Sequence, residues 1–220
     1  MGAARGGRAG VWLALAAGVG VVVVSLLLDR AVLAALDWPK AEREDWHRMF
    51  RVMGSLPTWV FASVAAALLL PPRAGVCGED EGRPRGVAAG LMVMVSAAAG
   101  GLMAEVLKVV LRRERPDAET MEYAFRALGE RTFSGAGLGM PSSHTMVAFA
   151  GAGALCVLGP RAAAVWLSLA AGCGFTRLVD RAHWLSDVAL GAVAGLAVAW
   201  ATARVFCPGA RAGAGKGAAA

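Results

Sequence analysis

Three clusters of charged and polar residues lie beside long apolar stretches, and their residue types suit the binding or transfer of a phosphate group. The first cluster, KVVLRRERP, ends at Pro116. Lys108 and Arg115 are seven residues apart, which is two helical turns, so we expect both on one helical face together with Arg112. Glu105, one turn before Lys108, is expected to pair with it. Cations on one face at a membrane boundary suit a phosphate, but side chains that reach toward lipid headgroups explain this cluster equally well.

The second cluster, GMPSSHT at residues 139–145, directly precedes an apolar stretch and is typical of a helix start. Pro141 suits the first helical turn, and Ser142 or Ser143 can cap it. The unpaired N–H groups and the positive dipole end of such a terminus bind anions. His144 would then stand where a proton donor reaches a bound phosphate, although a histidine at a helix start is more often a cap or an interface residue.

The third cluster, TRLVDRAHWLSD at residues 176–187, contains a candidate nucleophile. His183 and Asp187 are four residues apart on a predicted helix, so their side chains share a face. A carboxylate that bonds one imidazole nitrogen fixes the tautomer and leaves the other nitrogen available for attack. Arg177 adds a planar donor suited to two-point binding of phosphate. The alternative is a His–Asp pair at the membrane interface without a catalytic role.

The apolar stretches around these clusters predict the membrane-spanning helices that must position them. The 220-residue chain is 57% hydrophobic and only 17% charged, and it contains 29 glycines, a composition typical of packed transmembrane helices. A span requires roughly 20 apolar residues, and candidate stretches occur at 11–35, 56–71, 87–111, 144–159, 161–179 and 184–206. We therefore expect an all-α integral membrane bundle of six transmembrane helices, formed as a single domain by residues 1–207. The Gly/Ala-rich residues 208–220 are expected to be a disordered tail.

Charge and cysteine content argue against other classes of protein. The net charge is +6, but the arginines fall between apolar stretches without a basic, aromatic-interleaved patch, so we predict no nucleic-acid binding. The four cysteines show neither metal-ligand nor disulfide spacing, and we interpret them as structural: Cys77, Cys156, Cys173 and Cys207. Counting basic residues on the two sides of the predicted helices does not decide the orientation, although Arg5 and Arg8 weakly favour an inside N-terminus.

The connections between the predicted spans are less uniform in character. Segment 37–55 is charged, yet it carries apolar residues at helical spacing: Trp46, Met49, Phe50 and Met53. This pattern predicts a helix lying in the membrane interface, and a solvated connecting loop agrees with the composition equally well. Residues 72–86 are rich in proline, glycine, arginine and acidic residues, which predicts an exposed loop.

In this order, the patterns Lys-x6-Arg-Pro, Pro-Ser-Ser-His and Arg-x5-His-x3-Asp make the chain resemble the type 2 phosphatidic acid phosphatase superfamily. That family includes membrane lipid phosphatases and, more remotely, glucose-6-phosphatase and vanadate-dependent haloperoxidases. The motifs cover residues 108–187, and the predicted spans extend the resemblance over nearly the whole chain. Two positions depart from many members: Ser143 stands in place of a glycine and Thr176 in place of a serine, and both are small and polar.

The resemblance implies a phosphatase mechanism with a phosphohistidine intermediate. His183, oriented by Asp187, would attack phosphorus, and His144 would protonate the leaving oxygen. The phosphate oxygens would be held by Lys108, Arg115, Ser142, Ser143 and Arg177. No acidic cluster with magnesium-ligand geometry is evident, so we expect no metal ion or other cofactor, with fixed cations neutralising the charge. In bacterial members the three motifs meet on the periplasmic side, so we expect a multi-pass protein of the inner (plasma) membrane with its site facing the periplasm or cell exterior.

The expected partner is a phosphorylated lipid in the bilayer, because a hydrocarbon tail can stay in the membrane while its phosphate reaches the cations. Phosphatidic acid, phosphatidylglycerol phosphate, undecaprenyl diphosphate and lipid A all fit this description. Arg112 and Arg113 are candidates for binding the headgroup, whereas Arg126 and Arg131 are expected to be ordinary surface charges. Two other functions remain open: a non-catalytic lipid-binding or transport protein, and a haloperoxidase-like enzyme with vanadate in the phosphate site.

Overall fold

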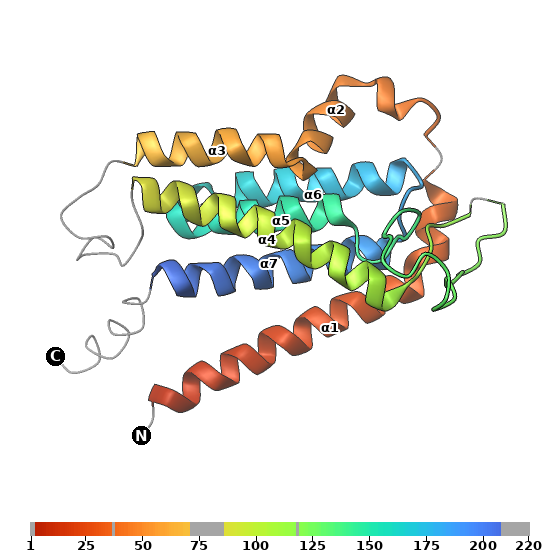
Figure 1. The fold of residues 1–220 in the computed structure, drawn as a ribbon, viewed down its shortest axis with the longest axis horizontal. Helices are drawn as coiled ribbons and strands as arrows, with labels where there is room; N and C mark the ends of the chain where they lie inside the picture. Colours follow the sequence, from red (N-terminus) through yellow and green to blue (C-terminus); the bar gives the residue numbers. More distant parts are fainter. Residues whose placement is uncertain (1–2, 37, 71–85, 118, 208–220) are drawn as a thin grey trace.

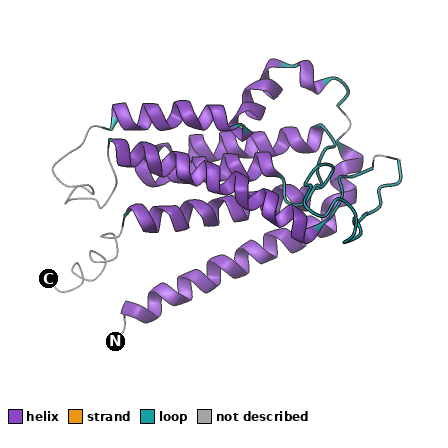
Figure 2. Cartoon of the chain, viewed as in Figure 1, coloured by secondary structure: helices purple, strands orange, loops and turns teal. Residues whose placement is uncertain are grey.

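The computed structural model describes residues 3–36, 38–70, 86–117 and 119–207 (Figure 1). The α-helices are α1 (Ala3–Ala35), α2 (Asp45–Arg51), α3 (Leu56–Leu69), α4 (Val87–Leu111), α5 (Ser143–Leu158), α6 (Ala163–Val179) and α7 (Leu185–Phe206). Short 3₁₀ helices are η1 (Ala41–Arg43), η2 (Val52–Gly54) and η3 (Pro160–Ala162). Figure 2 shows helices and loops but no strand in the described ranges, where the only bridges are isolated ones at Arg113–Phe125 and Glu114–Leu138. The all-α prediction is confirmed.

The long helices run back and forth, so that the segments holding the three clusters meet at one end of the bundle (Figure 1). α4 ends there just before the arginines of the first cluster, and α5 begins there within the second. The connection from α6 to α7 carries the third cluster to the same end. The order of the clusters along the helices is therefore what brings them together.

The middle of the bundle is occupied by α5, which contacts α4, α6 and α7. Beyond its polar first turn this helix is apolar on all sides, as expected of a helix enclosed by others. Small residues allow the close approach of its neighbours. A side chain at Gly151 would clash with the Trp59 ring, and a Cβ at Gly153 would lie 2.6 Å from the Cβ of Ala199. Glycines in α5 therefore set the helix spacing that places the start of α5 beside its neighbours.

Four segments are long and apolar enough to cross a membrane, which indicates a multi-pass membrane protein: Ala9–Ala35, Val87–Leu111, Pro160–Val179 and Leu185–Phe206. The prediction of six such spans is not confirmed by the described helices. α3 has 14 residues and α5 has 16, which makes them about 21 and 24 Å long, against about 30 Å for the hydrocarbon core. Segment 45–54 and α3 together would add a fifth span only as a pair bent by 74°.

Residues 41–54 form η1, α2 and η2, which favours the helix prediction for segment 37–55 over a solvated loop. α2 packs against α6. The ring of Trp46 lies 6.1 Å from that of Phe175, and Phe50 lies directly against Gly172. The segment therefore packs on the end of the bundle where the clusters meet.

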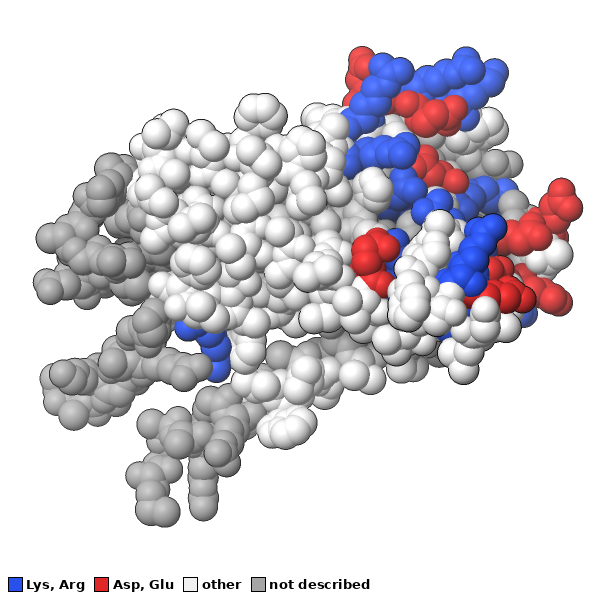
Figure 3. Space-filling model, viewed as in Figure 1, with Lys and Arg blue, Asp and Glu red and all other residues white. Residues whose placement is uncertain are grey.

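Charged side chains gather at this same end of the molecule (Figure 3). In this view they cover α2 and the segment between α4 and α5, while the sides of the long helices are almost uncharged. Exposed leucines on these sides, such as Leu27 of α1 and Leu69 of α3, suit contact with lipid tails. The loop predicted at 72–86, apart from Gly86, lies outside the described residues, as does the tail at 208–220.

Candidate active site

Lys108 links the first cluster to the second. It lies in the last turn of α4 and is buried. Its Nζ donates to Glu105 Oε1 at 2.8 Å and to Ser143 Oγ at 2.5 Å, and the Ser143 hydroxyl donates to the same Glu105 oxygen at 3.0 Å. The predicted Glu105–Lys108 pair is confirmed. An ammonium group has three N–H donors, so one is left for a substrate oxygen.

The prediction placed Arg115 on the same helical face as Lys108. In the structure, Arg115 instead reaches the site from the loop that follows α4. α4 ends before Arg112, which adopts a left-handed conformation with φ of 54° and turns the chain. The argument from the spacing of Lys108 and Arg115 is therefore wrong, because the helix stops between them. Arg115 nevertheless lies within electrostatic range of both Arg177 and His183.

The second cluster starts α5 without the predicted side-chain cap. Ser142 is the N-cap residue, but its side chain makes no capping bond and instead accepts the Thr145 hydroxyl at 3.0 Å. Pro141 precedes the N-cap and so lies outside the first turn, contrary to prediction. The Ser142 N–H donates to the backbone carbonyl of Asp187 at 3.0 Å. This bond ties the second cluster to the third.

A backbone carbonyl from the second cluster holds His183. The Nδ1 atom of His183 lies 2.9 Å from the carbonyl oxygen of Gly139 and 3.6 Å from Oδ2 of Asp187. A carbonyl only accepts hydrogen bonds, so Nδ1 carries the proton and Nε2 of the neutral ring keeps its lone pair. The predicted tautomer is therefore present, but Gly139 makes the direct bond that had been assigned to Asp187.

Asp187 stabilises the start of α7 and pairs with a buried arginine. Its Oδ2 accepts the backbone N–H of Trp184 at 2.9 Å, which caps the helix. Its Oδ1 lies 2.6 Å from Nη2 of Arg113. The Asp187 carboxylate is fully buried, and a buried charge requires such a partner. Asp187 thus positions both the His183 imidazole ring and the backbone segment next to it.

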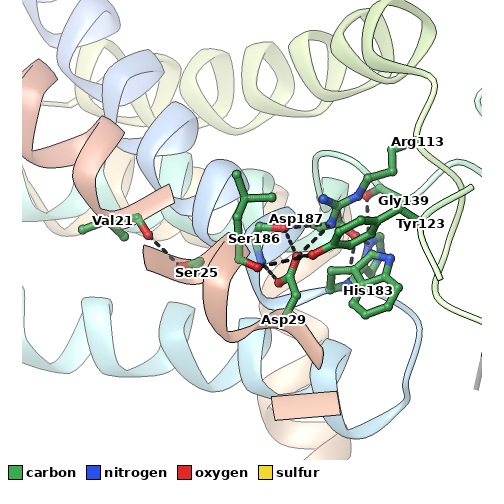
Figure 4. A network of polar contacts seen from close by, with 11 residues as sticks. Val21, Ser25, Asp29, Arg113, Tyr123, Gly139, His183, Ser186 and Asp187 are labelled. Atoms are coloured by element: carbon green, nitrogen blue, oxygen red, sulfur yellow. Dashed lines mark hydrogen bonds and ion pairs between the residues drawn. The ribbon is translucent and has the colours of Figure 1, made fainter. Parts of the chain in front are cut away.

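Arg113 belongs to a polar network that reaches α1 (Figure 4). Its Nη2 donates to Ser186 Oγ at 2.8 Å and lies 3.6 Å from Asp29 Oδ2. Asp29 also accepts the N–H of Ser186 at 2.7 Å and the hydroxyl of Tyr123 at 3.0 Å. Sequence reasoning missed Asp29, although an acid within a long apolar stretch is itself a signal of function. Arg113 is almost wholly buried in this network, so it does not face a lipid headgroup.

A second acid missed by sequence reasoning, Asp180, contacts three basic side chains. Its Oδ2 lies 2.5 Å from Nη1 of Arg177 and 3.7 Å from Nη1 of Arg51, and its Oδ1 lies 2.8 Å from Nε2 of His47. Arg177, the predicted phosphate-binding residue, stands in the last turn of α6 and is buried. Its ion pair with Asp180 fixes the position of its guanidinium group. No sequence signal pointed to His47 or Arg51, both of which come from α2.

His144 stands in the first turn of α5 and is half-buried. It lies within electrostatic range of Lys108, Arg177 and His183. η2 backs it closely, since a Cβ at Gly54 would lie 2.6 Å from the Cβ of His144. The bonds and electrostatic contacts described above thus bring together six of the predicted site residues: Lys108, Arg115, His144, Arg177, His183 and Asp187.

Arg112 and Arg126 organise the loop between α4 and α5. Arg112 is buried and donates to the carbonyl oxygen of Arg126 at 3.0 Å and to those of two further loop residues. Arg126 donates to Glu114 Oε1 at 3.2 Å, and its side chain is 7% exposed, so the prediction of a surface charge is wrong for Arg126. Arg131 is exposed, as predicted. The guanidinium groups of Arg112 and Arg113 are used within the protein, which argues against the predicted headgroup contact.

The surroundings of His183 keep its imidazole neutral. Burial lowers the pKa of His183, Arg177 and Arg115 lower it further, and Asp187 raises it, with a net shift downward. The ring is therefore unprotonated at neutral pH and available for nucleophilic attack. Across the described ranges, no group of three or more His, Cys, Asp or Glu side chains is arranged to hold a metal ion.

Comparison with known families agrees with this arrangement. The family model described as PAP2 superfamily matches residues 89–207, from α4 to the end of α7. The matched region contains all three clusters and makes up more than half of the 220-residue chain. No curated protein and no solved structure matches the chain. On the strength of the family match, the chain belongs to the PAP2 superfamily.

Proposed function

We propose that the protein is an integral membrane lipid phosphatase that acts through a phosphohistidine intermediate and without a metal ion. The observation that carries this proposal is the state of His183, whose Nδ1–H donates to the Gly139 carbonyl at 2.9 Å. Its Nε2 lone pair is then available, and the positive charges of Arg115 and Arg177 act on the ring. A neutral imidazole next to fixed cations suits attack on a phosphorus atom.

In the proposed reaction, Nε2 of His183 attacks phosphorus in line with the leaving oxygen, and the P–O bond breaks as the N–P bond forms. His144 gives its proton to the leaving oxygen and later takes one from the water that hydrolyses the phosphohistidine. Asp187 stabilises the positive charge that the His183 ring acquires. The oxygens of the transferred group are held by Lys108, Arg115, Arg177, Ser142 and Ser143.

A lipid substrate is proposed because the site lies at the charged end of an otherwise apolar bundle. The phosphate of a lipid can reach the basic side chains there while its tail stays in the bilayer. Phosphatidic acid, phosphatidylglycerol phosphate, undecaprenyl diphosphate and lipid A remain the candidates. The site is proposed to face the periplasm or cell exterior from the inner (plasma) membrane.

We also propose that α3 and α5 cross the membrane, which makes six spans in one domain of residues 1–207. Both helices are shorter than the hydrocarbon core. However, α5 is enclosed by α4, α6 and α7, so little of it faces lipid. α3 does face lipid, through exposed side chains such as Phe61 and Leu69, but mismatch costs only fractions of a kcal/mol per Å because the bilayer can thin around a short helix.

Phosphate release from a panel of these lipids by the purified protein tests the proposal. We expect release from at least one lipid, no loss of activity in EDTA, and no release by His183→Gln at an unchanged unfolding temperature. Substrate labelled in its phosphate should leave an acid-labile, alkali-stable label on the wild-type protein only. Failure to release phosphate from any lipid would refute the enzyme in favour of a lipid-binding protein. Halide oxidation that depends on added vanadate would favour a haloperoxidase.

A further inference from the structure

Arg51 is a basic residue at the proposed site that lies outside the three motifs and outside the region matched by the family model. Its Nη1 lies 3.7 Å from the same Asp180 oxygen that pairs with Arg177 at 2.5 Å. The Arg51 side chain is 48% exposed, whereas that of Arg177 is 6% exposed. One carboxylate therefore stands between an inner and an outer guanidinium group.

The outer guanidinium group is only weakly neutralised. Asp180 cannot turn toward Arg51, because its Oδ1 is bonded to the buried His47 at 2.8 Å and its Oδ2 to Arg177. The Arg51 contact exceeds hydrogen-bond distance. Two cations that share one carboxylate leave a net positive charge, and a guanidinium group binds phosphate oxygens in a two-point manner.

Arg51 also lies near His144, and this proximity indicates which part of the site Arg51 can serve. The two residues are within electrostatic range of one another. The Cys173 thiol lies 3.9 Å from the Arg51 carbonyl oxygen and 3.8 Å from the His144 carbonyl oxygen. The backbones at Arg51 and His144 are therefore separated only by the Cys173 side chain. Because His144 is the proposed donor to the leaving oxygen, this proximity favours a role for Arg51 on the leaving-group side.

We propose that Arg51 binds a second phosphate group of the substrate, so that lipid diphosphates are preferred over lipid monophosphates. This inference rests on the proposed function, which assigns the leaving-group side to His144. The terminal phosphoryl group transfers to Nε2 of His183 as the bond from its phosphorus to the bridging oxygen breaks. His144 protonates that oxygen, and the lipid monophosphate leaves with its phosphate bound by Arg51. Water then releases orthophosphate from His183.

The test compares Arg51→Gln with Arg48→Gln, a matched control one turn earlier in α2. The Arg48 side chain is 65% exposed and lies 3.7 Å from the exposed Asp45. With farnesyl diphosphate and farnesyl monophosphate as substrates, Arg51→Gln should lower kcat/KM about 10- to 100-fold for the diphosphate, the range expected for one charged hydrogen bond. The monophosphate should change less than about threefold, and Arg48→Gln should change neither. An equal loss on both substrates, or no loss, overturns the proposal.

A binding measurement separates this inference from the proposed function. Imidodiphosphate, which resists hydrolysis, and orthophosphate are titrated into the wild-type protein and Arg51→Gln by calorimetry in detergent. The wild-type protein should bind imidodiphosphate about tenfold more tightly, and Arg51→Gln should remove that difference. Equal binding of the two anions by the wild-type protein overturns the role of Arg51. If the wild-type protein releases phosphate from neither the farnesyl substrates nor any lipid of the panel, the phosphatase fails, and the binding result alone decides the inference.

Discussion

His183 donates its Nδ1 hydrogen to the carbonyl oxygen of Gly139 at 2.9 Å, and this bond joins two of the three motifs. Gly139 lies in the loop before α5, and His183 lies in the connection between α6 and α7. Asp187 acts at 3.6 Å, through its charge and through the cap it provides for α7. The orientation of the proposed nucleophile therefore depends on the backbone at residue 139 as much as on a carboxylate.

Replacement of Gly139 by alanine should impair catalysis by displacing this carbonyl. A Cβ there would lie 2.9 Å from Asp187 Oδ2 and 3.1 Å from the carbonyl oxygen of Glu114, so the carboxylate or the loop must shift. A displacement of about 1 Å costs on the order of 10²-fold in rate, so we expect kcat to fall about 10- to 100-fold. Gly129→Ala is the control, because nothing lies within 4 Å of a Cβ at that position. Equal kcat in the two variants would contradict a positioning role for Gly139.

Replacement of Asp29 by alanine should reduce stability more than activity. Asp29 accepts hydrogen bonds from the N–H and hydroxyl of buried Ser186, which would be left without this acceptor. It also accepts the hydroxyl of half-buried Tyr123, which can still donate to the Leu26 carbonyl oxygen. The loss of about 3 kcal/mol should lower the unfolding temperature by roughly 5–10 °C. Arg113 retains Asp187 at 2.6 Å, so kcat should stay within about tenfold of the wild-type value.

Tyr123→Phe provides the graded comparison for the Asp29 variant. It removes one donor and leaves both bonds from Ser186 in place. Its unfolding temperature, followed by tryptophan fluorescence in detergent, should fall by only about 3 °C. An unchanged unfolding temperature in Asp29→Ala would show that α1 does not depend on this network.

Helical spacing in the sequence correctly predicted a contact within one helix, but it gave a wrong prediction for residues on either side of a helix end. The Glu105–Lys108 pair follows from one helical turn and is present at 2.8 Å. The face shared by Lys108 and Arg115 does not exist, because Arg112 adopts φ of 54° and ends α4. Glycine or asparagine usually marks such a left-handed helix end, and an arginine there leaves no local signal.

Contacts between segments far apart in the sequence could not be predicted from sequence patterns. Asp29 and Ser186 are 157 residues apart, and His47 and Asp180 are 133 apart. Each pair forms only because α1 and α2 pack against the motif-bearing helices, which no periodicity within a segment reveals. The motifs and their order were therefore predictable, whereas the buried partners that hold them were not.

Activity should persist below the usual pKa of histidine because burial and two arginines lower the pKa of His183. Nucleophilic attack requires the unprotonated ring, so the acidic limb of kcat/KM should lie below about pH 6.5. Arg115→Gln removes one lowering charge, so its acidic limb should move to higher pH on the same substrate. A limb that stays in place or moves to lower pH would contradict the assignment.

The same shift predicts how stability varies with pH. As the pH falls, a histidine whose pKa is lowered on folding becomes protonated at a higher pH in the unfolded state than in the folded state. Stability contributed by neutral His183 should therefore be intact above about pH 6.5 and decline as the pH falls below that value. Between pH 8 and pH 5, the unfolding temperature of the wild-type protein should therefore fall more steeply than that of His183→Gln, which lacks the titrating ring.

Replacement of Glu105 by glutamine should strengthen phosphate binding. Lys108 donates to Glu105 Oε1 at 2.8 Å, so a phosphate bound by the remaining N–H donor would lie near this carboxylate and be repelled by its negative charge. Glutamine keeps the size and a hydrogen-bond acceptor but removes the negative charge beside the site. The Glu105 side chain is 53% exposed, and solvent screening limits the effect to about a threefold lower inhibition constant for orthophosphate. The exposed Glu122, in the loop between α4 and α5, is changed to glutamine as the control for the same loss of charge away from Lys108. The difference between the two variants should shrink at high salt. Weaker orthophosphate inhibition in Glu105→Gln would instead show that Glu105 aligns Lys108 for the substrate.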